Sequence, residues 1–185
     1  MRMVDTLPLA ITEDLRVFCR RISNATPAFV RSAPSPGAVP SHCFDNVARR
    51  IEDSRGDLVH GWAISHFRGA YFEAEHHGLW RSPAGDLQDV SPQPNGAKQL
   101  VFLEDESAIY DPAAFRSNII APEPGSLFGA RIAELARRRN QILDAYRAPG
   151  IKVPNLTSAD DAEIRAIGME LSLLLSLVVA STGRG

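Results

Sequence analysis

Cysteine is scarce in this sequence, with Cys19 and Cys43 the only two among 185 residues. Two cysteines cannot form the disulfide framework of a small secreted protein, and there is no C-x-x-C pair of the kind that holds structural zinc. A protein with so few cysteines is typical of a reducing compartment. We therefore expect a cytoplasmic location.

The sequence also lacks a charge excess and a long apolar run. Lys and Arg total 20 against 22 Asp and Glu, so the net charge is −2. No strong field is available to attract nucleic acid or an anionic membrane. The N-terminus has no apolar signal region, and the longest apolar stretch, 171–180, is shorter than the roughly 20 residues of a membrane span. We expect neither nucleic acid nor a membrane as a partner, and the oligomeric state stays open.

The remaining pattern predicts one α+β domain, 1–185, with its core in 41–105 and a C-terminal helical pair in 126–181. A first amphipathic helix is expected over 12–22, with Cys19 on its apolar face, and residues 24–40 carry four prolines and predict an irregular segment. The strands, about four in an antiparallel sheet, are expected at 57–67, 70–80, 87–90 and 98–104.

A helix is predicted to begin next to Cys43. Ser41 is a suitable N-cap, and apolar residues follow at i, i+3, i+4 and i+7 from Phe44. Cys43 then lies in the first turn, where backbone N–H groups have no intrahelical acceptor. These donors and the helix dipole favour a thiolate, and the N–H of Cys43 could serve an oxyanion.

His77 and Asp89 follow Cys43 by 34 and 46 residues, and they complete the side chains that thiol catalysis needs. An imidazole takes the thiol proton and returns it to the leaving group, and a carboxylate fixes the tautomer and orientation of that imidazole. His76 and His77 are neighbours on a predicted strand, so they point in opposite directions. Strand periodicity alone does not choose between them.

These segments resemble the core of transglutaminase-like and papain-like cysteine enzymes. The chain reads Cys43 at a helix start, then His77-Gly-Leu-Trp80, then Asp89-Val-Ser-Pro. It is also similar to a group of bacterial proteins with C-x-x-N-V, G-W, E-A-E-x-H-x-x-W and D-x-T-P segments. Trp80 lies three residues after the histidine rather than the commoner two, and no upstream Gln or Asn completes a papain-type oxyanion hole. The resemblance covers residues 41–105 and selects His77 as the base.

The resemblance implies a nucleophile helix packed on an antiparallel sheet, and a Cys43–His77–Asp89 triad. It implies acyl chemistry on a protein, peptide or other amide or ester substrate, as in a thiol protease or other hydrolase, an amidase, a deamidase or a transglutaminase, with no cofactor and no metal. We expect the acyl group to be held as a thioester.

Three further residues are candidates for substrate binding, each with a structural alternative. Glu75 lies beside His77 and could bind a cationic or amide group, or could lie on a solvated strand face. Asn46 lies one helical turn after Cys43 and could reach the edge of the site, or could be a helix-surface amide. Trp80 could shield the Cys–His pair from water, or could belong to the core.

Two other functions remain open. One is a zinc-binding protein that uses a His/Glu cluster, and the other is a non-catalytic binding module that kept the fold. The cluster has ligand types that zinc accepts, but it lacks a helix-borne H-E-x-x-H spacing. Its members are His60, Glu73, Glu75, His76, His77 and Cys43.

Overall fold

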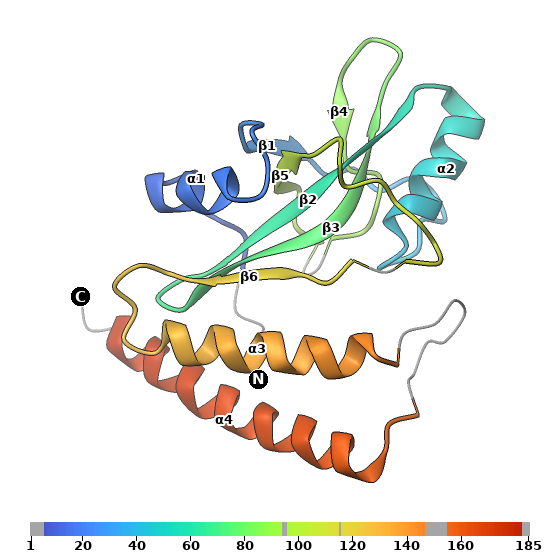
Figure 1. Cartoon of the computed structure of the whole chain (residues 1–185). Coiled ribbons are helices and arrows are strands. Elements are labelled where there is room, and N and C mark those ends of the chain that lie inside the picture. Colours follow the sequence, from blue (N-terminus) through green and yellow to red (C-terminus); the bar gives the residue numbers. More distant parts are fainter. Residues whose placement is uncertain (1–5, 94–95, 115, 147–154, 183–185) are drawn as a thin grey trace. The chain divides into compact units, whose positions relative to one another are not determined.

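The computed structural model describes residues 6–93, 96–114, 116–146 and 155–182. In these ranges the chain has an α+β fold with four helices and an antiparallel, nearly barrel-shaped sheet (Figure 1). It separates into two compact units. We call Leu7–Ser65 with Ala74–Tyr110 the sheet unit, and Met1–Thr6, His66–Glu73 and Asp111–Gly185 the helix-pair unit.

The sheet unit contains two helices and most of the strands. A long hairpin, β2 and β3, begins and ends in this unit, while its turn belongs to the helix-pair unit (Figure 1). The strand order is β1-β5-β2-β3-β4. The elements are α1 (Glu13–Arg20), β1 (Ala28–Arg31), α2 (Cys43–Ser54), β2 (Asp57–Phe67), β3 (Tyr71–Arg81), β4 (Leu87–Gln88) and β5 (Gln99–Glu104).

The first and last strands of this order meet just beyond β4. Ser32 and Asp89 form an isolated parallel bridge. The Asp89 N–H donates to the Arg31 carbonyl at 3.0 Å, and the Ala33 N–H donates to the Asp89 carbonyl at 2.8 Å. The backbone of Asp89 is thereby held by the end of β1, which fixes the place from which its side chain extends.

Neighbouring residues of β3 belong to two different buried clusters. Leu79 packs with apolar side chains of β1, β2 and β5, whereas Trp80 packs with Val47 of α2 and with Val90. Successive strand residues point to opposite faces. Helix α2 therefore covers the Trp80 face of β3, and this packing places the first turn of α2 near the middle of the strand.

The helix-pair unit consists of β6 (Ile119–Pro122), α3 (Gly129–Asp144) and α4 (Ser158–Thr182), together with the turn of the β2–β3 hairpin. Strand β6 pairs with β3, and α3 and α4 lie side by side (Figure 1). Ile167 of α4 packs against Leu135 and Ile142 of α3. By length and composition, α4 would be able to cross a membrane, which is weak evidence about where the protein resides.

The prediction of about four strands is wrong, because six are present in the described residues. The two missed strands, β1 and β6, have only four residues each, and β1 lies inside the proline-bearing segment that we predicted to be irregular. The cap of α2 also differs from the prediction. Ser41 has a φ of 62°, and His42 occupies the N-cap position without a side-chain capping bond.

Candidate active site

Cys43 is the first residue of α2, and its side chain is half-buried. The segment that leads into it is held by Asn46. The Asn46 side-chain oxygen accepts from the Val39 N–H at 2.9 Å, and its nitrogen donates to the Val39 carbonyl at 2.8 Å. The Asn46 nitrogen also donates to the Ser91 hydroxyl at 3.0 Å. These bonds tie the beginning of α2 to the segment that follows Asp89.

Gly78 allows α2 to lie close to β3. A Cβ atom at this position would be 2.8 Å from Cδ1 of Phe44 and 2.9 Å from Cδ1 of Leu58, which is closer than carbon atoms approach one another. Phe44 directly follows Cys43, so the missing side chain at position 78 sets how near the thiol comes to the strand. His77 is the neighbour of Gly78 on that strand.

His77 joins the other two predicted residues of the triad. Its Nε2 lies 3.2 Å from Oδ1 of Asp89, and the Cys43 side chain is near enough to influence the pKa of the ring. Burial by itself lowers the pKa of His77, but the interactions of the ring with Asp89 and Cys43 outweigh burial and raise the pKa to about 10. The shift favours an imidazolium at neutral pH, which is the form that stabilises a thiolate.

Asp89 is fully buried, and hydrogen-bond donors surround its carboxylate. Besides His77, the Ser91 N–H donates to Oδ1 at 3.0 Å, and the Gln93 side-chain amide donates to Oδ2 at 2.6 Å. A buried carboxylate is costly unless such donors and a cation accompany it. The arrangement therefore keeps Asp89 oriented toward the His77 ring.

His76 has other partners than the three residues of the triad. Its Nε2 lies 2.7 Å from the Ala108 carbonyl oxygen, and its ring packs 4.8 Å from Phe44 and 5.5 Å from Trp62, centroid to centroid. Phe44 also stacks on Tyr110, with centroids 4.0 Å apart and an interplanar angle of 8°. These aromatic rings line the side of the Cys43 turn, and Tyr110 is 38% exposed.

The three predicted substrate-binding residues have different surroundings. Glu75 is exposed and, two residues before His77, points to the same side of β3. Trp80 is buried, and its indole N–H donates to the Arg55 carbonyl at 2.8 Å. Asn46 is 1% exposed, and the bonds described above engage its amide. Of the three, Glu75 is the residue that solvent and a ligand can reach.

The side chains of the predicted zinc cluster do not converge. In the described part of the chain, no group of three or more His, Cys, Asp or Glu side chains is positioned to hold a metal ion. His76 and His77 turn to opposite sides of β3, toward Ala108 and Asp89 respectively. The geometry thus gives the zinc alternative no support from these residues.

Three residues around the triad were not singled out from the sequence: Ser91, Gln93 and Tyr110. Ser91 carried a usable signal, because an aspartate side chain commonly accepts from the N–H two residues later. The sequence around Gln93 and Tyr110 gave no such signal. The contact of Gln93 with Asp89 and that of Tyr110 with Phe44 depend on how the loops that carry them fold.

Comparisons of this chain with family models, curated proteins and solved structures find no match.

Proposed function

We propose that the chain is a cysteine-dependent acyl-transfer enzyme that acts on an amide or ester as a peptidase, amidase, deamidase or transglutaminase-like enzyme. One observation carries the proposal: His77, whose ring bonds to Asp89, lies near enough to Cys43 for the thiol to raise its pKa, and Cys43 is the first residue of a helix. A nucleophile, a base and an orienting carboxylate in that order are the groups that thioester chemistry needs.

The first half-reaction forms the thioester. The Cys43 thiolate attacks the substrate carbonyl carbon, and the carbonyl oxygen becomes an oxyanion. Backbone N–H groups in the first turn of α2, including that of Cys43, can donate to this oxyanion. As the tetrahedral intermediate collapses, the bond to the leaving amine or alcohol breaks, and the His77 imidazolium gives that group its proton.

The second half-reaction regenerates the thiolate. Neutral His77 accepts a proton from an incoming water or amine, which attacks the thioester carbonyl, and the Cys43 sulfur leaves as thiolate. Water yields a carboxylic acid, whereas an amine yields a new amide. Asp89 stays ionised and holds the His77 ring in place throughout both steps.

We propose a transglutaminase-like or papain-like core for the sheet unit. In support, helix α2 packs on β3, the strand that carries His77, and the backbone of Asp89 is held at the end of β1. The resemblance of the Cys43, His77 and Asp89 segments to those families points the same way. Glu75, exposed on the His77 side of β3, is the candidate contact for an amide or cationic substrate group.

An activated ester tests the proposal without knowledge of the natural substrate. Incubation of the full chain with p-nitrophenyl acetate should give a burst of nitrophenol and an acetyl group on Cys43, located by peptide mass spectrometry. Cys43→Ala should abolish both signals and His77→Ala should reduce both strongly, while Cys19→Ser should leave them unchanged. Acetylation elsewhere, or an equal burst from Cys43→Ala, would exclude the proposed nucleophile.

A further inference from the structure

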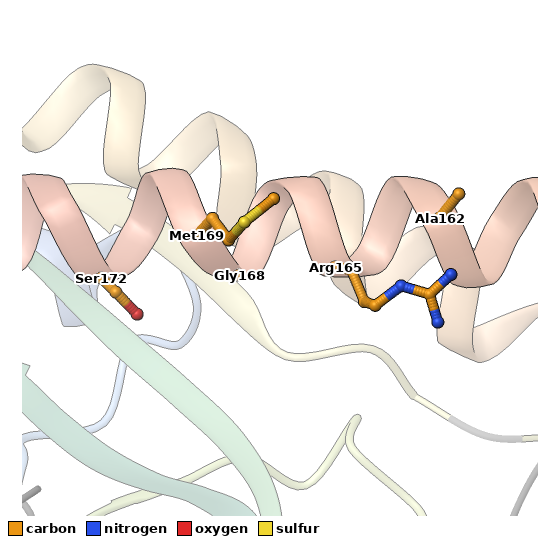
Figure 2. A pocket seen from close by; sticks show the side chains of 5 residues that line it. All are labelled: Ala162, Arg165, Gly168, Met169 and Ser172. Carbon is orange, nitrogen blue, oxygen red and sulfur yellow. The ribbon is translucent and has the colours of Figure 1, made fainter.

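Large apolar side chains stay exposed in two regions of the described chain. One is α4, where a hollow is lined by residues of that helix alone (Figure 2). The other adjoins Cys43 in the sheet unit, where Val39 is 42% exposed, Ile109 62% and Tyr110 38%. Exposed apolar side chains beside a reactive group are typical of a surface that binds a small ligand.

Cys43 lies between two parts of this apolar surface. On one side, the Phe44 ring stacks on Tyr110 in the loop after β5, which reaches the beginning of α2 (Figure 1). On the other side, the Asn46 amide bonds to both the N–H and the carbonyl of Val39. Residues 44 and 46 are about 200° apart around an α-helix, and residue 43 lies between them. Tyr110 and Val39 therefore flank the turn that carries the thiol.

The loop that carries Tyr110 is held by bonds to β2 and β3. The Trp62 indole N–H donates to Oδ2 of Asp105 at 2.9 Å, and the Ala108 N–H donates to the Asp105 carbonyl at 3.0 Å. The Ala108 carbonyl oxygen in turn lies 2.7 Å from Nε2 of His76. A surface that is already ordered does not have to be ordered when a ligand binds, which favours binding. Trp62 and His76 are thus positioning residues for Tyr110.

The charges around this surface are acidic. Asp45 lies in the first turn of α2, Glu75 lies two residues before His77, and Glu106 belongs to the loop after β5; all three are exposed. The sequence has no Lys or Arg between positions 99 and 115. Like charges placed near one another oppose binding, so a substrate group that carries a carboxylate is disfavoured here. A neutral apolar group meets no such repulsion.

We propose that Tyr110 and Val39 form a subsite for a neutral apolar group of the substrate, next to the carbonyl that Cys43 attacks. Tyr110 is the main specificity-determining residue. An aromatic or aliphatic side chain or acyl group removes apolar surface from water when it lies against these two residues, whereas a small group does not. The inference rests on the proposed function for the carbonyl, and on the contacts of Phe44 and Asn46 for the subsite itself.

N-substituted iodoacetamides test the subsite without any acyl transfer, because alkylation requires only the thiol. N-benzyl iodoacetamide should alkylate Cys43 of the full chain about tenfold faster than iodoacetamide does, once each rate is divided by the rate of the same reagent with N-acetylcysteine. Peptide mass spectrometry measures both rates. N-(4-carboxybenzyl) iodoacetamide should lose most of this advantage, because its carboxylate meets the acidic surroundings.

Substitutions at Tyr110 connect the advantage of the benzyl reagent to the subsite. Tyr110→Ala should remove most of the advantage, and Tyr110→Phe should keep it, because the ring supplies the apolar contact. Phe29→Ala is the matched control and should also keep it, since Phe29 is an aromatic residue of the same 38% exposure on β1. An absent advantage, or equal slowing of both reagents by Tyr110→Ala, would overturn the subsite. An advantage that disappears as the protein concentration rises would assign the surface to contact between copies instead.

The result is separable from that of the p-nitrophenyl acetate experiment. Acetylation of Cys43 without an advantage for the benzyl reagent would refute the subsite and leave the proposed enzyme intact. An advantage without acetylation would refute the enzyme, and it would support an apolar binding surface beside a thiol that does no acyl chemistry.

Discussion

At the residue scale, the carboxylate of Asp89 is the most constrained part of the candidate site. Its two oxygens accept from the Ser91 N–H and the Gln93 amide as well as facing His77. Those bonds leave the carboxylate little freedom to turn away, so the His77 ring is held with one nitrogen on Asp89. Gln93 acts through Asp89 and is therefore a positioning residue rather than a catalytic one.

Replacing Asp89 by Asn should slow the alkylation of Cys43 by iodoacetamide at neutral pH by about tenfold. The substitution keeps the shape but removes the charge that favours the His77 imidazolium, and a hydrogen bond to a charged group contributes about 1.5–3 kcal/mol. His77→Ala should slow the reaction at least as much. Because the two residues act as a unit, the double variant should be little slower than His77→Ala.

Two internal references make that measurement specific. Burial raises the pKa of Cys19 to about 11, so peptide mass spectrometry should find Cys19 largely unmodified while Cys43 reacts. Asp86→Asn is the matched carboxylate control, because Asp86 is exposed three residues before Asp89. A rate lowered by Asp86→Asn and untouched by Asp89→Asn would show that the wrong carboxylate was assigned.

At the element scale, the helices and four of the strands, β2 to β5, could be predicted from the sequence, whereas β1 and β6 could not. The periodicity of 57–67 and 70–80 indicates β2 and β3 because eleven alternating residues give a clear signal. Strands β1 and β6 have four residues each and exist through pairing with distant strands. Such pairing carries no local pattern, so a single sequence does not reveal it.

The same limit applies to the elements of the candidate site. The first-turn position of Cys43 follows from local helix periodicity. The selection of His77 over His76 came from the resemblance, since both histidines fit the strand equally well. Gln93 meets Asp89 only because the loop after β4 folds back, and that closure depends on the bridge between Ser32 and Asp89.

Gly78→Ala should destabilise the sheet unit by about 1–3 kcal/mol, the usual cost of adding atoms to a packed contact. The new Cβ would meet Phe44 at 2.8 Å and push the first turn of α2 away from β3. We therefore expect both a lower urea midpoint and slower Cys43 alkylation.

Gly168→Ala is the control substitution, because a Cβ at Gly168 meets open space. It should leave the alkylation rate of Cys43 unchanged and stabilise α4 by about 0.5–1 kcal/mol. Unchanged alkylation in a folded Gly78→Ala protein would contradict the packing argument.

At the scale of the whole molecule, the two compact units can be followed by different signals. Both tryptophans, Trp62 and Trp80, belong to the sheet unit, which also contains the triad. Most of the helical residues belong to α3 and α4 of the helix-pair unit. Tryptophan fluorescence therefore reports unfolding around the candidate site, whereas far-ultraviolet circular dichroism is dominated by the helix pair.

His77 should make the stability of the sheet unit depend on pH. Its pKa rises from 6.5 to about 10 on folding, so the native state binds the proton more tightly than the unfolded chain. The stabilisation is fully present below pH 6.5 and is lost as the pH rises through 10, at about 1.4 kcal/mol for each pH unit in which only the native state is protonated. Urea unfolding at about pH 6, 8 and 10, followed by tryptophan fluorescence, should show wild type losing its advantage over His77→Gln as the pH increases. An advantage that grows with pH would mean that His77 is neutral in the native state, and that the imidazolium on which the proposed first half-reaction depends is absent.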